Sequence, residues 1–277
     1  MKNLSDGLLV LYDAKVDFRD ALDIAAKLFE SLGIKPNDMG YQRPGRDGSG
    51  YSEVKSVKKL SDFESLIEEP GLQHIVIASR ERGNPAAYLT FYYGHDEIHP
   101  DFYRLIVAYK GKKLVDFDLE GLVPLVQGVN GRGTIPYGFS CHIDLDEVTQ
   151  YEYADAQTLF VPFLPYEDPD RWKVEVPTYL AGHVSPRRYL SGMLRLVYEW
   201  NFLNSAHLAM SIGDGSLGGW IEDDSTRGVL SQIDNGLWSW HVDPSRLVEI
   251  NEACGRAGLL VAWKAPAPSA RPGARLP

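Results

Sequence analysis

The feature that most constrains the fold is a series of three short runs rich in β-branched and aromatic residues. They occupy residues 74–80, 86–93 and 102–110, and turn residues separate them at 82–85 and 94–100. Runs of this length divided by short turns are typical of an antiparallel meander. Aromatic side chains also suit the close cross-strand pairs of such a sheet. The sequence therefore predicts a sheet that is largely antiparallel.

Elements before and after these runs predict helices that pack against the sheet. Residues 7–12 (GLLVLY) predict a short buried strand. Asp17 then predicts the N-cap of a helix whose apolar residues recur at helical spacing until Gly33 ends it. Residues 40–51 contain four glycines and predict a loop. Two more helices are expected here, a short one at 60–69 capped by Ser61 and one at 116–128 that Pro124 breaks or kinks.

Two helix starts stand out in the second half of the chain. Ser185-Pro186 combines an N-cap with proline at the first helical position and predicts a helix up to Asn204. Its apolar residues cover most of the circumference, which indicates a helix central to the core. Asp243-Pro244 predicts a last helix by the same pattern, with glycines 255 and 258 at its end. Strands are expected at 137–145, 157–163, 171–180 and 259–263.

The order of these elements favours the α+β class, because helices and strands do not alternate as regular βαβ units. We expect a mixed, largely antiparallel sheet with helices packed on it. The chain has 277 residues, which suits one large domain or two modest ones. We predict a single unit over 1–264, with an internal boundary near 129–136 if there are two subdomains. A flexible proline-rich tail is predicted at 265–277.

Charge and cysteine content narrow the classes of function. The chain holds 38 acidic and 28 basic residues, a formal net charge of −10. An acidic protein is poorly suited to binding nucleic acid, because phosphates require a basic face. The two cysteines, Cys141 and Cys254, are too few for a secreted disulfide framework. Residues 1–6 lack the basic segment of a signal peptide, and no apolar run reaches membrane-spanning length. We expect a cytoplasmic protein with no nucleic-acid or membrane partner.

Three motifs resemble catalytic or cofactor sites without their full context. Residues 213–218 read G-x-G-x-x-G, but the acidic residues 222–224 that follow would repel a pyrophosphate. His95 and His99 have metal-ligand spacing, although their surroundings predict a turn. Cys141 and His142 are adjacent on a predicted strand, so their side chains point to opposite faces. We therefore predict no catalytic residues, no metal and no cofactor. A hydrolase with a cleft between the two halves remains an alternative, with His95, His99, Cys141 and His142 as its candidates.

Acidic residues concentrate in the second half of the chain. Residues 1–140 hold 20 acids and 17 bases, whereas residues 141–277 hold 18 acids and 11 bases. Aromatic residues lie among the acidic ones, and carboxylates beside large aromatic side chains suit an interface with a basic protein. The predicted partner-binding residues are Asp144, Asp146, Glu147, Asp214, Trp220, Glu222, Asp223, Asp224, Trp238 and Trp240. The alternative is a solvated acidic surface over a core that contains those tryptophans.

Three segments carry a resemblance to a known family: residues 189–200 (YLSGMLRLVYEW), 218–224 (GGWIEDD) and 237–241 (LWSWH). With them, the chain resembles the immunity proteins of bacterial polymorphic toxin systems, in particular the family encoded beside restriction-endonuclease-like toxins. The resemblance implies a protein that binds a cognate toxin and blocks it in the producing cell. Such toxins are often nucleases delivered by contact-dependent or type VI secretion systems. A non-catalytic assembly adaptor is a further alternative.

Overall fold

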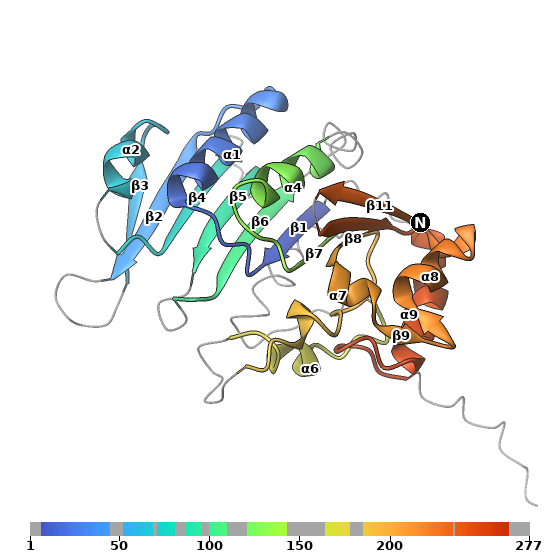
Figure 1. Cartoon of the computed structure of the whole chain (residues 1–277). Coiled ribbons are helices and arrows are strands. Elements are labelled where there is room, and N and C mark those ends of the chain that lie inside the picture. Colours follow the sequence, from blue (N-terminus) through green and yellow to red (C-terminus); the bar gives the residue numbers. More distant parts are fainter. Residues whose placement is uncertain are drawn as a thin grey trace, which may run out of the picture.

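The computed structural model describes residues 7–44, 52–68, 71–80, 87–95, 100–109, 121–142, 164–177, 185–234 and 236–265. Ten of its strands form one sheet in which every neighbouring pair is antiparallel (Figure 1). From one edge to the other these strands are β11 (Val229–Asp234), β12 (Leu237–His241), β8 (Trp200–Asn204), β7 (Tyr137–His142), β1 (Gly7–Tyr12), β6 (Tyr103–Tyr109), β5 (Ala87–His95), β4 (His74–Arg80), β2 (Asp38–Pro44) and β3 (Ser52–Val57). The α+β prediction is confirmed.

Helices α1 (Phe18–Ser31), α2 (Asp62–Ile67) and α4 (Leu122–Asn130) cover one face of the sheet over its N-terminal strands (Figure 1). The α1 helix begins where the sequence predicts, because the Asp17 carboxylate accepts a hydrogen bond from the Arg19 backbone N–H at 2.7 Å. Gly33 follows the helix with a φ of +63°, a conformation that favours glycine. The buried side of α1 packs against alternate residues of the meander, among them Ile77 and Phe91.

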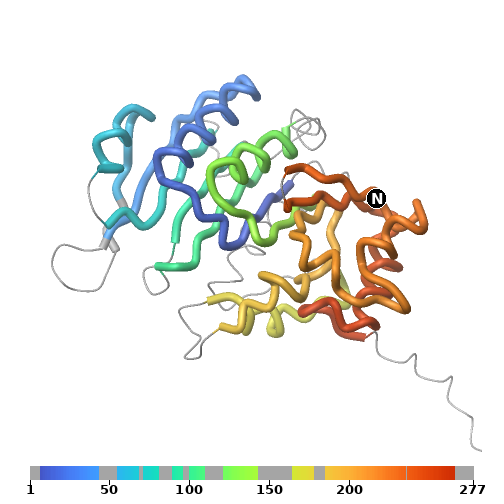
Figure 2. The backbone as a smooth tube through the Cα atoms, viewed as in Figure 1, coloured from blue at the N-terminus to red at the C-terminus, as the bar shows by residue number. Residues whose placement is uncertain are grey.

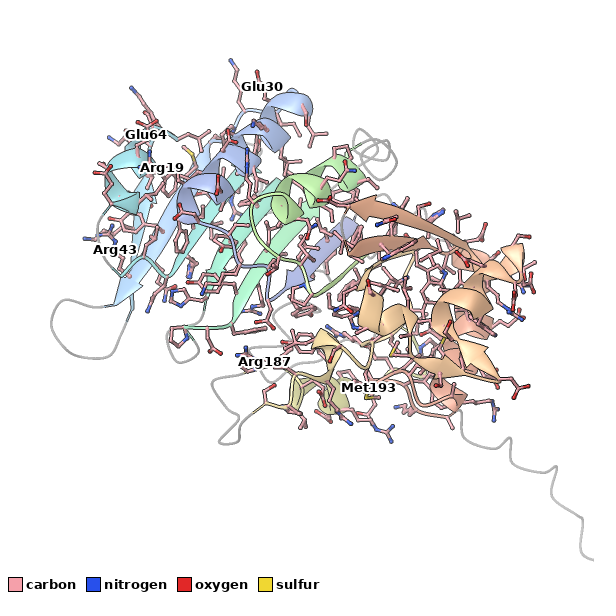
Figure 3. All side chains as sticks on the ribbon, viewed as in Figure 1. Arg19, Glu30, Arg43, Glu64, Arg187 and Met193 are labelled. Carbon is pink, nitrogen blue, oxygen red and sulfur yellow. The ribbon has the colours of Figure 1, made fainter. Side chains whose placement is uncertain are left out.

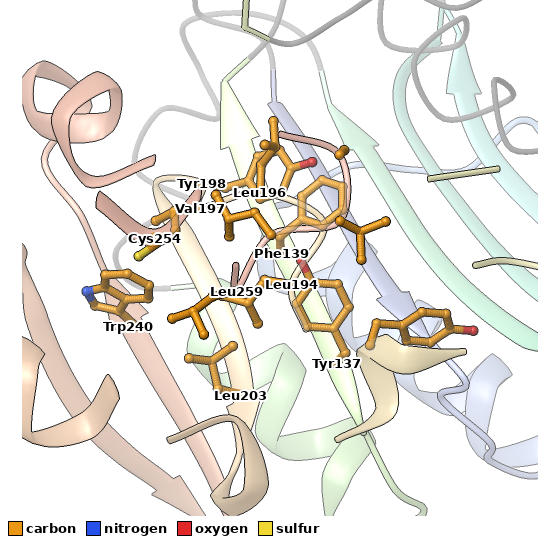
Figure 4. Packing of buried hydrophobic residues seen from close by; sticks show 14 of the residues in the cluster. Tyr137, Phe139, Leu194, Leu196, Val197, Tyr198, Leu203, Trp240, Cys254 and Leu259 are labelled. Carbon is orange, nitrogen blue, oxygen red and sulfur yellow. The ribbon is translucent and has the colours of Figure 1, made fainter. Parts of the chain in front are cut away.

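The C-terminal part of the chain packs on the opposite face. It includes α6 (Pro169–Lys173), α7 (Ser205–Leu208), α8 (Leu217–Glu222) and α9 (Leu247–Arg256), and it lies to the right and below in Figure 2. Figure 4 shows the core on this side, where Tyr137 and Phe139 from β7 lie near Leu194 and Leu196, and Trp240 lies beside Cys254. The central strand β1 serves both cores, because its alternate side chains face opposite sides of the sheet.

Several predicted elements are confirmed. Strand β1 has the predicted bounds, and β4, β5 and β6 form the predicted antiparallel meander. Residues 137–142 form β7. Asp243 caps the start of the last helical region, where its carboxylate accepts from the Ser245 N–H at 2.8 Å. Here the one-turn η4 (Pro244–Arg246) leads into α9.

The helix predicted over residues 185–204 is wrong. The structure has only the one-turn η2 (Arg188–Leu190) there, followed by an extended segment and then β8. The extended segment pairs with the end of the chain, since the Leu194 N–H donates to the Leu259 carbonyl at 2.9 Å. A segment that is apolar on all sides fits a buried extended chain as well as a buried helix, so its composition does not distinguish the two.

Other predictions also need correction or lie outside the described residues. Residues 40–44 belong to β2 rather than to a loop, and residues 169–173 form a helix rather than the start of a strand. Pro124 does not break α4, because the helix begins at Leu122 and the proline falls in its first turn. Residues 259–263 make only isolated bridges. The strand predicted at 157–163, residues 143–145 and the tail after 265 lie outside the described residues. The boundary near 129–136 stays a prediction.

Candidate protein-binding surface

Four of the predicted partner-binding residues lie on neighbouring elements, and we call them the acidic corner: Asp214, Glu222, Asp223 and Asp224. Asp214 lies in the turn between β9 (Ser211–Ile212) and β10 (Gly215–Ser216), where Gly213 has a φ of +57°. The other three carboxylates follow one another at the end of α8 and just beyond it. The β9–β10 hairpin therefore positions Asp214, and the short helix α8 positions the other three carboxylates.

Helix α8 exposes its acidic end because its apolar side is anchored. The Ser216 side chain caps the helix by accepting from the Gly219 N–H at 3.2 Å. Leu217 and Ile221 are buried in the C-terminal core. Glu222 and Asp223 are consequently left on the solvent side, where both are exposed.

Among the described residues, three of the four carboxylates of the acidic corner have no partner. In the part of the chain that the structure describes, the side chains of Asp214, Glu222 and Asp223 make no hydrogen bond and no ion pair. Asp224 differs, because it accepts from both the backbone N–H and the hydroxyl of Thr226, at 2.9 and 2.8 Å. These hydrogen bonds lower the pKa of Asp224. Asp224 thus has a local structural role, and the other three remain available to a partner.

The nearest base is engaged by the protein itself. The Arg227 Nη1 donates to the Trp220 carbonyl at 2.6 Å, and its guanidinium lies 4.4 Å from the centre of the Trp220 ring. That ring is half-buried. A cation over an indole face is a stabilising contact. Arg227 therefore braces Trp220, while its Nε lies 3.8 Å from the Asp224 carboxylate.

The predicted tryptophan anchors differ in exposure. Trp220 and Trp238 are half-buried and reach the surface. Trp240 is 0% exposed, and its indole N–H donates to the Arg227 carbonyl at 2.8 Å. Trp240 is therefore not a surface contact, because both its ring and its polar atom are committed inside the protein. Its hydrogen bond instead fixes the backbone at Arg227, next to Asp224 and the acidic corner.

The acidic residues between positions 144 and 175 do not form a second binding surface in the described structure. Asp144, Asp146 and Glu147 lie outside the described residues. Farther along the chain, Glu167 and Glu175 have fully buried side chains. Each is paired with an arginine: the Arg195 Nε lies 3.1 Å from Glu167, and the Arg188 Nε lies 2.8 Å from Glu175. These two acids hold the fold together and are not part of a binding surface.

The catalytic and cofactor candidates lie in separate places. His95 is at the end of β5, and Cys141 and His142 are at the far end of β7, with β1 and β6 between the two strands. Cys141 is buried, and His142 Nδ1 contacts the Glu199 carboxylate. His99 lies outside the described residues. Among those that are described, no three His, Cys, Asp or Glu side chains group together as metal ligands would. The three glycines of residues 213–218 do not form one phosphate loop, because Gly213 lies in the β9–β10 turn, Gly215 in β10 and Gly218 inside α8.

A second polar cluster has no signature in the sequence. Asp13 and Arg187 are 174 positions apart, yet Arg187 Nη1 lies 3.4 Å from the Asp13 carboxylate. They are the only non-glycine residues in the described chain with positive φ, at 51° and 45°. Asp13 also accepts from the Tyr189 hydroxyl at 2.8 Å. Burial raises the pKa of Asp13. This cluster joins β1 to the C-terminal core.

The fold and the acidic corner define a large antiparallel α+β protein that presents carboxylates at the end of α8. No protein-family model matches the chain, and no curated protein matches it. Among solved structures, the chain is similar to the Pseudomonas aeruginosa T6SS protein PA0821. The TM-score is 0.57 at 13% sequence identity, over 92% of this chain and 73% of that one. This likeness shows a shared fold. No helix in the described ranges is long and apolar enough to cross a membrane.

Proposed function

We propose that this protein is an immunity protein, which binds a basic antibacterial effector in a stoichiometric complex and neutralises it. The observation that carries the proposal is the placement of Glu222 and Asp223 at the C-terminal end of α8, with no base in the last turn. Carboxylates at that end oppose the helix dipole and lower stability. Charged side chains that lower the stability of the fold and have no partner within it are expected at sites that bind another protein.

The chemistry of the partner follows from the charge of the acidic corner. A nuclease must present a basic surface to the phosphates of its substrate. Carboxylates on an inhibitor attract that surface, accelerate association and compete with the nucleic acid. Trp220, half-buried beside the acidic corner, supplies aromatic area of the kind that dominates binding energy at interfaces. The likeness to a T6SS protein supports a partner from a type VI secretion system.

The first experiment is calorimetry with the toxin domain encoded by the gene next to this one, in catalytically inactive form, at two salt concentrations. We expect tight 1:1 binding that weakens as salt rises. Co-expression with the active toxin should restore growth. Absence of binding, or binding without protection, would contradict the proposal.

A charge-reversal pair locates the binding surface. The variant Glu222→Lys/Asp223→Lys should slow association at least about tenfold at low salt, and the difference should shrink at high salt. The matched control is Glu30→Lys/Glu64→Lys, which makes the same change of net charge on α1 and α2. Figure 3 labels both control residues at the opposite end of the sheet from α8. Equal slowing in both variants would show an effect of net charge alone.

A further inference from the structure

Strand β11 is an edge of the ten-stranded sheet in the part of the chain that the structure describes, and α8 of the acidic corner contacts it. It is the last strand in the order, and no other described strand pairs with its outer side. Its far end is occupied by α4, since the Gln127 side chain donates to the Ile233 carbonyl at 3.0 Å and Asn130 donates to the Asp234 carboxylate at 3.1 Å. The open stretch is therefore residues 229–232.

The register shows which backbone groups point outward. The Val242 N–H donates to the Glu199 carbonyl at 2.8 Å, so Val242 directs its backbone groups toward the β8 side. Because direction alternates along a strand, Ser239 and His241 direct theirs toward β11, opposite Ser231 and Val229. Leu230 and Gln232 must then direct their N–H and C=O groups away from the sheet. A chain that pairs with these two residues would extend the sheet by one strand.

The two faces beside this edge differ in chemistry. On one face Leu230 packs against the C-terminal core, and α8 contacts β11 there, so the acidic corner lies on this side. On the other face Val229 is 59% exposed. It lies opposite His241, whose ring stacks on Trp200 with 4.3 Å between the centres. One face thus carries α8 with its carboxylates, and the other carries Val229 and the stacked rings of His241 and Trp200.

We propose that β11 receives an extended segment of the inhibited effector as an eleventh strand of the sheet. Alternate side chains of that segment are basic toward the acidic corner and apolar toward Val229. This inference rests on the proposed function and names the element that the effector supplies. A second copy of this chain is a poorer occupant, because it would bring two acidic corners together in a protein of net charge −10. Main-chain pairing supplies affinity in such complexes, and the alternating side chains supply selectivity.

The test removes one outward N–H and leaves the fold intact. Gln232→Pro deletes the N–H that points away from β12, a position where an edge strand tolerates proline. Its matched control is Gln232→Ala, which keeps the N–H and removes the exposed side chain. We expect Gln232→Pro to weaken binding of the inactive toxin domain by on the order of tenfold or more, and Gln232→Ala to change it by less than about twofold. Circular dichroism checks that both variants fold.

Hydrogen exchange on the unmodified protein gives a second readout that needs no variant. The amides of Leu230 and Gln232 should exchange quickly in the free protein and slowly in the complex, whereas Val229 and Ser231 should be protected in both. Tight binding with no new protection at Leu230 and Gln232 would overturn the added strand and leave the immunity function standing. A doubled mass in light scattering without effector, with protection at these amides, would assign the edge to a second copy instead. If the toxin domain does not bind at all, the proposed function itself fails.

Discussion

Carboxylates are buried and paired at Glu167 and Glu175 but exposed in the acidic corner. Glu167 and Glu175 have fully buried side chains, and each meets an arginine. Glu222 and Asp223 are exposed and have no partner in the described chain. A buried charge is tolerated only when it is paired, whereas an exposed one needs no partner. The acidic excess of the second half therefore divides into charges that hold the fold and charges that are free to meet another molecule.

The largest effect should come from breaking a buried pair. Arg195→Ala removes the guanidinium that pairs with the Glu167 carboxylate, in a site where the two side chains are 0–1% exposed. Loss of one member of a buried pair typically costs about 3–5 kcal/mol of unfolding free energy. Urea denaturation measures the loss. The control is Arg256→Ala, which breaks an exposed pair with Glu252 and should cost far less. A loss below about 1 kcal/mol for Arg195→Ala would show that this pair does not hold the fold.

Acid should lower the stability of the folded protein through the buried His207. Its ring is 0% exposed, and burial lowers the pKa of His207 to about 4 from an ordinary 6.5. Between these two pKa values His207 is protonated in the unfolded chain but not in the folded protein. Its contribution to the unfolding free energy is therefore complete above pH 6.5 and is lost as the pH falls toward 4. Between pH 7.5 and 5 this amounts to about 2 kcal/mol of unfolding free energy. His207→Gln should flatten the pH dependence in urea titrations. An unchanged slope in that variant would assign it to other groups.

The sequence predicts elements well where a local signal acts alone. Asp17, Gly33 and the spacing between them define α1, and the turn residues between apolar runs define the meander. Prediction fails at residues 185–204, because their conformation depends on distant pairing: residues 194–195 pair with residues 259–262, and residues 200–204 pair with β7 and β12. Composition alone does not carry that information.

The candidate site divides in the same way. That Glu222 and Asp223 are exposed follows from their place at the end of a short helix. The buried state of Trp240 and the pairing of Glu167 with Arg195 depend on long-range packing. In the sequence, a surface tryptophan beside acidic residues looks the same as a buried one, so the pattern does not distinguish an interface residue from a core residue. The cluster of Asp13, Arg187 and Tyr189 has no local signal in the sequence, since Asp13 lies 174 and 176 positions from the other two.

A smaller effect should separate two neighbours within the acidic corner. Asp224→Ala removes the acceptor for the Thr226 N–H and hydroxyl, which caps η3 (Ser225–Arg227). Asp223→Ala removes a side chain with no partner in the described structure. Asp224→Ala should therefore lower the midpoint of thermal unfolding, by less than Arg195→Ala does, and Asp223→Ala should not lower it. Equal midpoints for the two variants would mean that the cap contributes nothing measurable.

The smallest effect on stability is also the most informative. Glu222→Lys/Asp223→Lys places positive charge at the C-terminal end of α8, where it favours the helix dipole. The midpoint of urea unfolding should stay the same or rise slightly, while the same variant associates more slowly with the effector. Residues whose loss stabilises a protein but impairs binding are retained for binding. A clear fall in the midpoint would instead show that these carboxylates stabilise the fold, as Glu167 and Glu175 do.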